Sequence, residues 1–202
     1  MKIVNDYPPD IYQRQYQEMK GLLFEYQDDL KKALKEGGNY KDLWGSIWNV
    51  REPGVIGEVI KPIISDLLDF KRFKPPTWPK DIVDKEMSRI NEMCKNTEQF
   101  VLSDVTARLF ESLQFIRGSQ NLFLDITYDE PIFYKLLNMV YEYHMEEVEY
   151  WCKTEVDAVH LLLKDAYLHN NSITLFLNKT FEKKFAIVKI IGLFYKNYFL
   201  LH

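Results

Sequence analysis

The stretch FVLSDVTARLFESLQFIRG (100–118) joins a short apolar run to a pattern of helical period. FVLSDV, bounded by polar residues, predicts a buried strand, and ARLFESLQFIRG predicts a helix that ends at Gly118. VDAVHLLL (156–163) predicts a second buried strand. Between the two runs, the clearest helical pattern begins at Pro131 and continues to about Thr154. A strand, a long helical crossover and a second strand form a βαβ unit, so the sequence predicts neighbouring parallel strands in one sheet.

Other segments predict further elements around this unit. A helical pattern extends from Pro8 to about Glu36 and is closed by glycines. SIWNV and GVIGEVI, within 46–60, are separated by Arg51-Glu52-Pro53-Gly54 and predict a β-hairpin. We also expect a short helix within 61–70, a helix over 80–96, a strand at ITLFL (173–177) and a helix that follows Asn178.

The composition favours one globular domain and argues against several classes of protein. The chain has 202 residues, of which 47% are hydrophobic and 28% charged, so we expect a real core. A net charge of −4 without a basic stripe argues against nucleic acid as a partner. The amino terminus lacks a signal-peptide pattern, and 185–201 is interrupted by lysines and short for a membrane span. We therefore expect a cytoplasmic protein that does not cross a membrane.

Three segments, in the same order along the chain, resemble the uroporphyrinogen decarboxylase family. They are KDLWGSIWNVREPGVIGEVIKPIISDLLDFKRFKPP (41–76), FVLSDVTARLFESLQFIRGSQNLFLDI (100–126) and EVDAVHLLLKDAYLHNNS (155–172). They are most similar to the decarboxylase-like branch that includes the methylcobalamin:coenzyme M methyltransferases. The resemblance covers about residues 40–202.

The resemblance implies an α/β fold, a (β/α)8 TIM-type barrel with its site at the carboxyl ends of the strands. Such a barrel typically takes about 250 residues, so we expect a helix-rich partial barrel over 40–202, preceded by an N-terminal helical segment over 1–39. The resemblance further implies tetrapyrrole- or corrinoid-linked chemistry. This is either cofactor-independent decarboxylation or zinc-assisted methyl transfer from a corrinoid.

The sequence departs from the family where the chemistry would be carried out. The arginine-rich amino-terminal motif and the first-strand aspartate motif of the decarboxylases have no counterpart. The zinc ligands of the methyltransferases would fall in the half of the barrel that is absent, so no metal ligands are expected. We therefore expect a truncated member of the family. Enzyme activity stays an open alternative, because the complete set of catalytic residues of the family is not recognisable.

Six residues are candidates for a site at the strand ends. Asp165 follows the second strand and is the candidate catalytic carboxylate, either as a general base or as a ligand of a pyrrole NH, although it could simply cap the loop. Arg108 could bind a substrate carboxylate or pair with Glu111 on the helix surface. Trp44 and Trp48 could form a wall against a flat ligand or only anchor the hairpin. Tyr167 and Asn170 share the loop of Asp165 and are further candidates for substrate binding.

A non-catalytic module is the alternative function. A partial barrel would expose strand edges and apolar helix faces, and these surfaces favour pairing with another chain. The alternative therefore predicts a homo-oligomer, whereas the leading hypothesis predicts a small-molecule partner.

Overall fold

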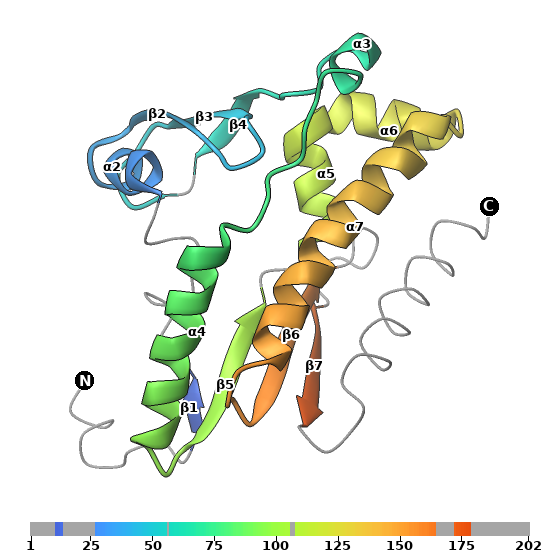
Figure 1. Cartoon of the computed structure of the whole chain (residues 1–202). Coiled ribbons are helices and arrows are strands. Elements are labelled where there is room, and N and C mark those ends of the chain that lie inside the picture. Colours follow the sequence, from blue (N-terminus) through green and yellow to red (C-terminus); the bar gives the residue numbers. More distant parts are fainter. Residues whose placement is uncertain (1–10, 14–26, 56, 106–107, 165–171, 179–202) are drawn as a thin grey trace.

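The computed structural model describes residues 11–13, 27–55, 57–105, 108–164 and 172–178. Figure 1 shows two sheets joined by a layer of helices. The fold is mixed α/β and rich in helix.

The larger sheet contains four strands in the order β1-β5-β6-β7. These are β1 (Ile11–Gln13), β5 (Phe100–Val105), β6 (Ala158–Lys164) and β7 (Ser172–Asn178). β5 is parallel to both β1 and β6, with Leu102 opposite Ala158, so the predicted parallel neighbours are confirmed. β7 is the predicted ITLFL strand and runs antiparallel to β6, a direction that an all-parallel cylinder does not contain.

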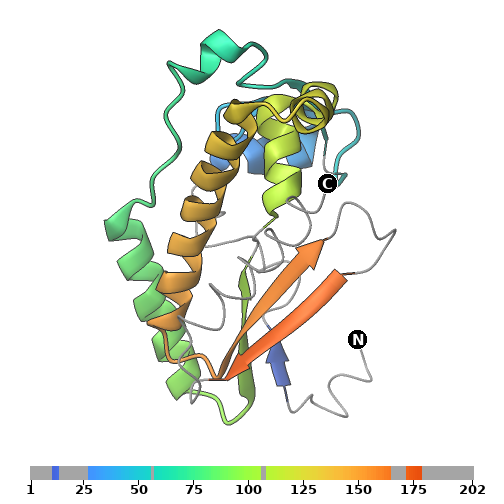
Figure 2. The same ribbon diagram turned by 90° about the vertical axis from the view of Figure 1, so that its right-hand side faces the viewer.

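Two long helices cover one face of this sheet, as Figures 1 and 2 both show. They are α4 (Lys80–Lys95) and α7 (Pro131–Cys152), which agree with the predicted ranges. The backbone N–H groups in the first turn of a helix have no acceptor within the helix. Proline has no N–H, so Pro131 is well suited to the position where α7 begins. Along one face of α7, Leu136, Val140, His144 and Val148 are buried and Ile132 is partly buried.

The crossover from β5 to β6 also contains α5 (Leu109–Arg117) and α6 (Ser119–Thr127). Gly118 separates these two helices with a φ of +79°, a backbone conformation that glycine adopts without the usual strain. The main core lies between these helices, α4, α7 and β5. Its most deeply buried side chains include Val83, Ile90, Leu113, Ile116, Leu122 and Val140.

The smaller sheet has three antiparallel strands in the order β2-β3-β4. These are β2 (Gly38–Lys41), β3 (Ile47–Val50) and β4 (Glu58–Lys61). The predicted hairpin is therefore present as β3–β4, and α2 (Asp28–Glu36) packs beside β2. A Cβ on Gly57 would lie 2.1 Å from the Asn49 carbonyl oxygen, so only glycine permits this approach of the two strands.

One expectation for the amino-terminal part is wrong. The predicted helix from Pro8 to Glu36 is interrupted by β1, whose residues pair with β5, and the described helix begins only at Asp28. The expected boundary between residues 39 and 40 falls inside β2. At Ile11–Gln13, pairing with the distant strand β5 overrides the local helical pattern.

The remaining predicted elements agree in part with the structure. The short helix within 61–70 is α3 (Leu67–Phe70). The expected helix after Asn178 and the apolar segment 185–201 lie outside the described residues.

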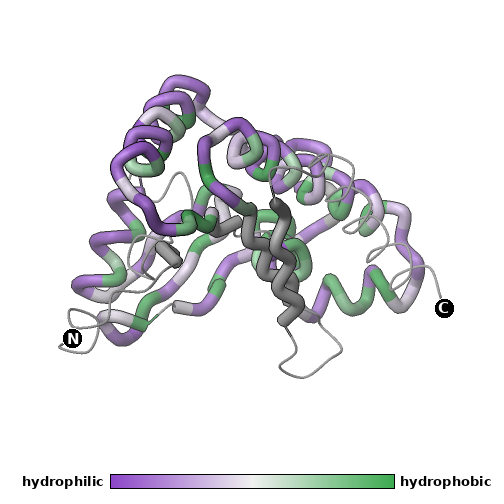
Figure 3. Tube along the Cα trace, turned by 90° about the horizontal axis from the view of Figure 1, so that it is seen from below, coloured by the Kyte–Doolittle hydropathy of each residue, from purple (hydrophilic) through white to green (hydrophobic). Residues whose placement is uncertain are grey.

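Figure 3 shows hydrophobic and hydrophilic residues alternating along the helices, as is typical of helices with one buried side. Within the described ranges, every helix is too short or too polar to cross a bilayer.

Candidate functional site

The small sheet lies at the end of the molecule toward which β5 and β6 point (Figure 1). Ser46 fixes it there, because the Ser46 hydroxyl donates to the Phe115 carbonyl oxygen of α5 at 2.9 Å. The same hydroxyl oxygen accepts a hydrogen bond from the Ile63 N–H at 3.1 Å. Ser46 is fully buried, so both bonds are shielded from water. The carboxyl end of the parallel strands is thus the end at which the small sheet packs.

Asp42 organises the loop that carries both candidate tryptophans. One carboxylate oxygen accepts hydrogen bonds from the backbone N–H groups of Gly45 and Ser46, at 2.7 and 2.8 Å. The other accepts from the Trp48 indole at 2.7 Å. Burial raises the pKa of Asp42, and the hydrogen bonds from Trp48 and the loop backbone oppose this rise. The sequence reasoning did not select Asp42 as a functional residue, although it precedes Trp44 by two residues.

Trp48 anchors the small sheet and offers a ligand little surface. Its side chain is 6% exposed, stacks on Tyr40 and meets the ring of Phe115 edge-on at 4.5 Å between centroids. Trp44 is partly buried, with its ring stacked near Phe73 and edge-on to Tyr143 at 4.8 Å. Of the two candidate tryptophans, only Trp44 has appreciable surface that a ligand could contact.

Arg108 immediately precedes α5 and lies three residues after the end of β5 in the sequence. Its side chain is 44% exposed, and its guanidinium lies 4.0 Å from the Glu111 carboxylate, at the limit of an ion pair. An exposed pair at this separation contributes little to stability. The Arg108 guanidinium is therefore in a position that solvent reaches.

The loop of Asp165, Tyr167 and Asn170 lies outside the described residues. Their candidate roles therefore remain predictions. The described part of the candidate site consists of Arg108 at the start of α5 and the Trp44–Trp48 loop, which contacts α5 through Phe115.

Arg117 and Asp125 form a buried ion pair that the sequence reasoning missed. The Arg117 guanidinium donates to both carboxylate oxygens of Asp125, from Nε at 2.7 Å and from Nη2 at 3.1 Å. Nη1 donates to the carbonyl oxygens of Ile64 and Ser65, at 3.1 and 2.9 Å. The bidentate bonds to Asp125 join α5 to α6. The two bonds from Nη1 join these helices to the segment after β4, and so hold the small sheet in place.

A second buried polar cluster lies between α5 and α7. The Ser112 hydroxyl lies 3.2 Å from His144 Nε2, and His144 Nδ1 lies 3.7 Å from the Glu147 carboxylate. All three side chains are buried, and Glu147 is 1% exposed. His144 lies among the buried residues of α7, but nothing in the sequence indicated Ser112 as its partner.

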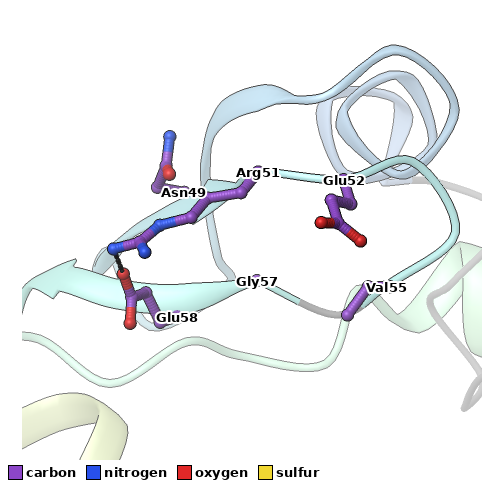
Figure 4. Close-up of a pocket in the computed structure, with 6 residues that line it drawn as sticks. All are labelled: Asn49, Arg51, Glu52, Val55, Gly57 and Glu58. Atoms are coloured by element: carbon purple, nitrogen blue, oxygen red, sulfur yellow. Dashed lines mark hydrogen bonds and ion pairs between the residues drawn. The ribbon is translucent and has the colours of Figure 1, made fainter.

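Two hollows among the described residues lie away from the strand ends that the sequence selected. One, of about 260 Å³, lies at the tip of the β3–β4 hairpin and is lined by Asn49, Arg51, Glu52, Val55, Gly57 and Glu58 (Figure 4). Arg51 and Glu58 form an exposed ion pair across it. The other, of about 280 Å³, lies beside Phe100 at the opposite end of β5 from Arg108. Neither hollow includes a candidate site residue.

Within the part of the chain that the structure describes, no three His, Cys, Asp or Glu side chains are grouped as metal ligands would be. No family model, curated protein or solved structure matches this chain.

Proposed function

We propose that this protein is a uroporphyrinogen decarboxylase-like partial barrel that binds a tetrapyrrole or corrinoid at the carboxyl ends of its parallel strands. The chemistry proposed with this binding is decarboxylation or methyl transfer. The observation that carries the proposal is the docking of the small sheet on α5, at the end toward which β5 and β6 point. Active sites of parallel α/β barrels lie at this end of the strands.

The connection between β5 and β6 supports the same proposal. The two strands are parallel neighbours, and α5, α6 and α7 lie between them in sequence. A parallel pair joined through helices is the repeating unit of a barrel. The antiparallel β7 marks where such a repeat would stop, which fits a partial barrel rather than a closed one.

Arg108 is the described residue best placed to bind the ligand. Tetrapyrroles of this class carry several carboxylates, and guanidinium binds carboxylate in a bidentate manner. The exposed position of Arg108 beside the end of β5 leaves its guanidinium accessible. Asp165 remains the proposed acid–base residue for decarboxylation, in which protonation of a pyrrole carbon precedes loss of the carboxyl group.

Methyl transfer is the weaker of the two proposed reactions. It requires a zinc ion that activates a thiolate, and the described residues provide no cluster of ligands for that ion. We therefore derive no step through zinc. A corrinoid would instead be bound against the exposed part of the Trp44 side chain.

Titration of the purified chain with uroporphyrin, coproporphyrin and cobalamin, followed by absorbance, tests the proposal. We expect saturable binding of at least one of the three. Arg108→Gln should raise the dissociation constant about tenfold or more, because it removes a charge-assisted contact to a carboxylate. Arg89→Gln is the matched control, since Arg89 pairs with Glu86 on α4, away from the small sheet.

Two results would contradict the proposal. Absence of binding of all three compounds to the folded chain would contradict the proposed ligand class. Equal dissociation constants for the Arg108 and Arg89 variants would contradict the proposed position of the site.

An assembly module is the second candidate function, and exposed apolar residues on and after α6 favour it. Phe123, Leu124 and Tyr128 are 51%, 44% and 70% exposed. Sedimentation at several protein concentrations tests whether this surface pairs with a second copy. Dimers that disappear in a Phe123→Ser/Tyr128→Ser double variant would support the assembly module, and a monomer at every concentration would exclude it.

A further inference from the structure

Three buried polar atoms on one side of α7 have no hydrogen-bond partner in the described part of the chain. They are His144 Nδ1, Glu147 Oε1 and Trp151 Nε1. The three residues are spaced by three and four positions, so their side chains follow one face of the helix over two turns. Their side chains are 7%, 1% and 3% exposed, and bulk water does not reach these atoms.

Such a group of unpaired atoms is costly in a protein interior. An unpaired buried polar group costs about 1–3 kcal/mol, and a charged one costs more, so nearly all such groups bind protein or an ordered water. Here the three atoms are chemically complementary, because the indole N–H is a donor, the carboxylate oxygen is an acceptor, and the imidazole nitrogen can be either.

The separation of His144 and Glu147 also suggests a bridging water. His144 Nδ1 and the nearer Glu147 oxygen are 3.7 Å apart, which is too long for a direct hydrogen bond. A polar contact of this length is where a bridging water is expected. On the other side of the ring, His144 Nε2 lies within hydrogen-bond distance of the Ser112 hydroxyl, which fixes the direction in which Nδ1 points.

We propose that α7 has an internal water-binding site formed by His144, Glu147 and Trp151. Water at this site accepts a hydrogen bond from the Trp151 indole and donates to the Glu147 carboxylate. It also completes the contact between Glu147 and His144. The site is independent of the proposed tetrapyrrole-binding function, and its ligand is water.

The tryptophan indoles provide a direct test with internal controls. Trp48 and Trp78 donate their indole N–H to Asp42 and to the Tyr143 carbonyl oxygen, at 2.7 and 3.0 Å, whereas Trp151 has no such partner among the residues that the structure describes. In rotating-frame Overhauser spectra of the ¹⁵N-labelled full chain, we expect a cross-peak with water at the Trp151 indole and none at Trp78. Trp→Phe variants assign the indole signals.

A relay through a hydroxyl group must be distinguished from bound water. The Thr154 hydroxyl donates to the Trp151 carbonyl oxygen at 2.7 Å, so the spectrum is repeated on Thr154→Val. Persistence of the Trp151 cross-peak in this variant supports the site. Loss of the cross-peak in the variant, or its absence in the wild-type chain, overturns the proposal.

Two variants of Glu147 give a second readout by thermal unfolding. If the site holds water, Glu147→Gln keeps a polar partner for it, and Glu147→Met should melt at a lower temperature than Glu147→Gln. If the site is dry, methionine removes an uncompensated carboxylate and should melt at a higher temperature than the wild type. A Glu147→Met variant that is more stable than both other proteins would therefore overturn the proposal.

Discussion

The Arg117–Asp125 pair and the His144–Glu147 pair are both buried in the helical layer, yet their polar atoms are satisfied to different degrees. Arg117 makes two bonds to Asp125 and two to backbone carbonyl oxygens. His144 and Glu147 are 3.7 Å apart, and each retains an atom without a partner among the described residues. A buried charge is tolerated when its partners come from several segments, and these partners also fix the positions of those segments.

The difference follows from where the partners lie. Arg117 ends α5, and its partners lie on α6 and on the segment after β4. His144 and Glu147 lie on the same helix, three residues apart, so their contact joins no second segment of the fold. The first pair joins three parts of the fold, and the second depends on the α5 contact through Ser112.

Replacement of Arg117 by methionine should have the largest effect on stability. It leaves the Asp125 carboxylate buried without its cation, so we expect a loss of about 3–5 kcal/mol in the free energy of unfolding, measured by urea denaturation. The double variant Arg117→Met/Asp125→Leu should recover much of this loss because both charges are removed. Arg89→Met, which affects a half-exposed arginine, is the control. A single variant no less stable than this control would contradict the structural role of the buried pair.

Alkaline pH should distinguish the buried Tyr143, which lies near the Glu147 carboxylate, from an exposed tyrosine. Burial, and then the negative charges of Glu147 and Glu146, raise the pKa of Tyr143 above its ordinary value of 10.0. The folded state therefore holds the phenol proton more tightly than the unfolded state, and this stabilisation is complete below pH 10 and is lost as pH rises above 10. We expect Tyr143 to contribute a fall of up to about 1.4 kcal/mol per pH unit above pH ~10.

Urea denaturation at pH 9 and pH 11 measures this effect. Tyr143→Phe should reduce the loss of stability between the two pH values. Tyr128→Phe, at a residue that is 70% exposed, serves as the control. Identical pH dependence of the wild-type chain and Tyr143→Phe would show that Tyr143 does not make this contribution.

Replacement of Ser112 by alanine should have the smallest effect of the three. It removes the hydroxyl that lies 3.2 Å from His144 Nε2 and leaves one more buried atom without a partner. We expect a loss of about 1 kcal/mol in the free energy of unfolding. Ser88→Ala on α4 is matched to it, because the exposed Ser88 hydroxyl bonds only within its own helix. An equal effect of the two changes would mean that the Ser112–His144 contact contributes nothing to stability.

Regular elements with a strong local pattern could be predicted from the sequence. The apolar run at 100–105, the helix that begins at Pro131 and the β3–β4 hairpin all agree with the structure. Each has signals within a few residues of itself, such as proline at a helix start or glycine in a turn. For the candidate site, the sequence indicated an ion pair with Glu111 as one of two alternatives for Arg108, and the two side chains lie 4.0 Å apart.

Features that depend on distant segments could not be predicted in this way. Ile11–Gln13 is a strand because its backbone pairs with β5, about 90 residues away in the sequence. Trp48 could equally have faced a ligand, and only the positions of Tyr40 and Phe115 make it an anchor. Asp125 gave no sign in the sequence that it is buried against Arg117.

The sequence by itself determined helices α4, α5 and α7 and the β3–β4 hairpin, because periodicity, proline and glycine act locally along the chain, and the order strand, helices, strand implied the parallel β5–β6 pair. The tertiary structure decided which polar side chains are buried together and which strand closes each sheet edge. The physical reason is that the free energy of a buried charge or an unpaired strand depends on partners that chain folding brings from elsewhere. Arg117, Asp125, His144 and Glu147 look alike as charged or titratable residues in the sequence, and only their partners distinguish a satisfied pair from an unsatisfied one.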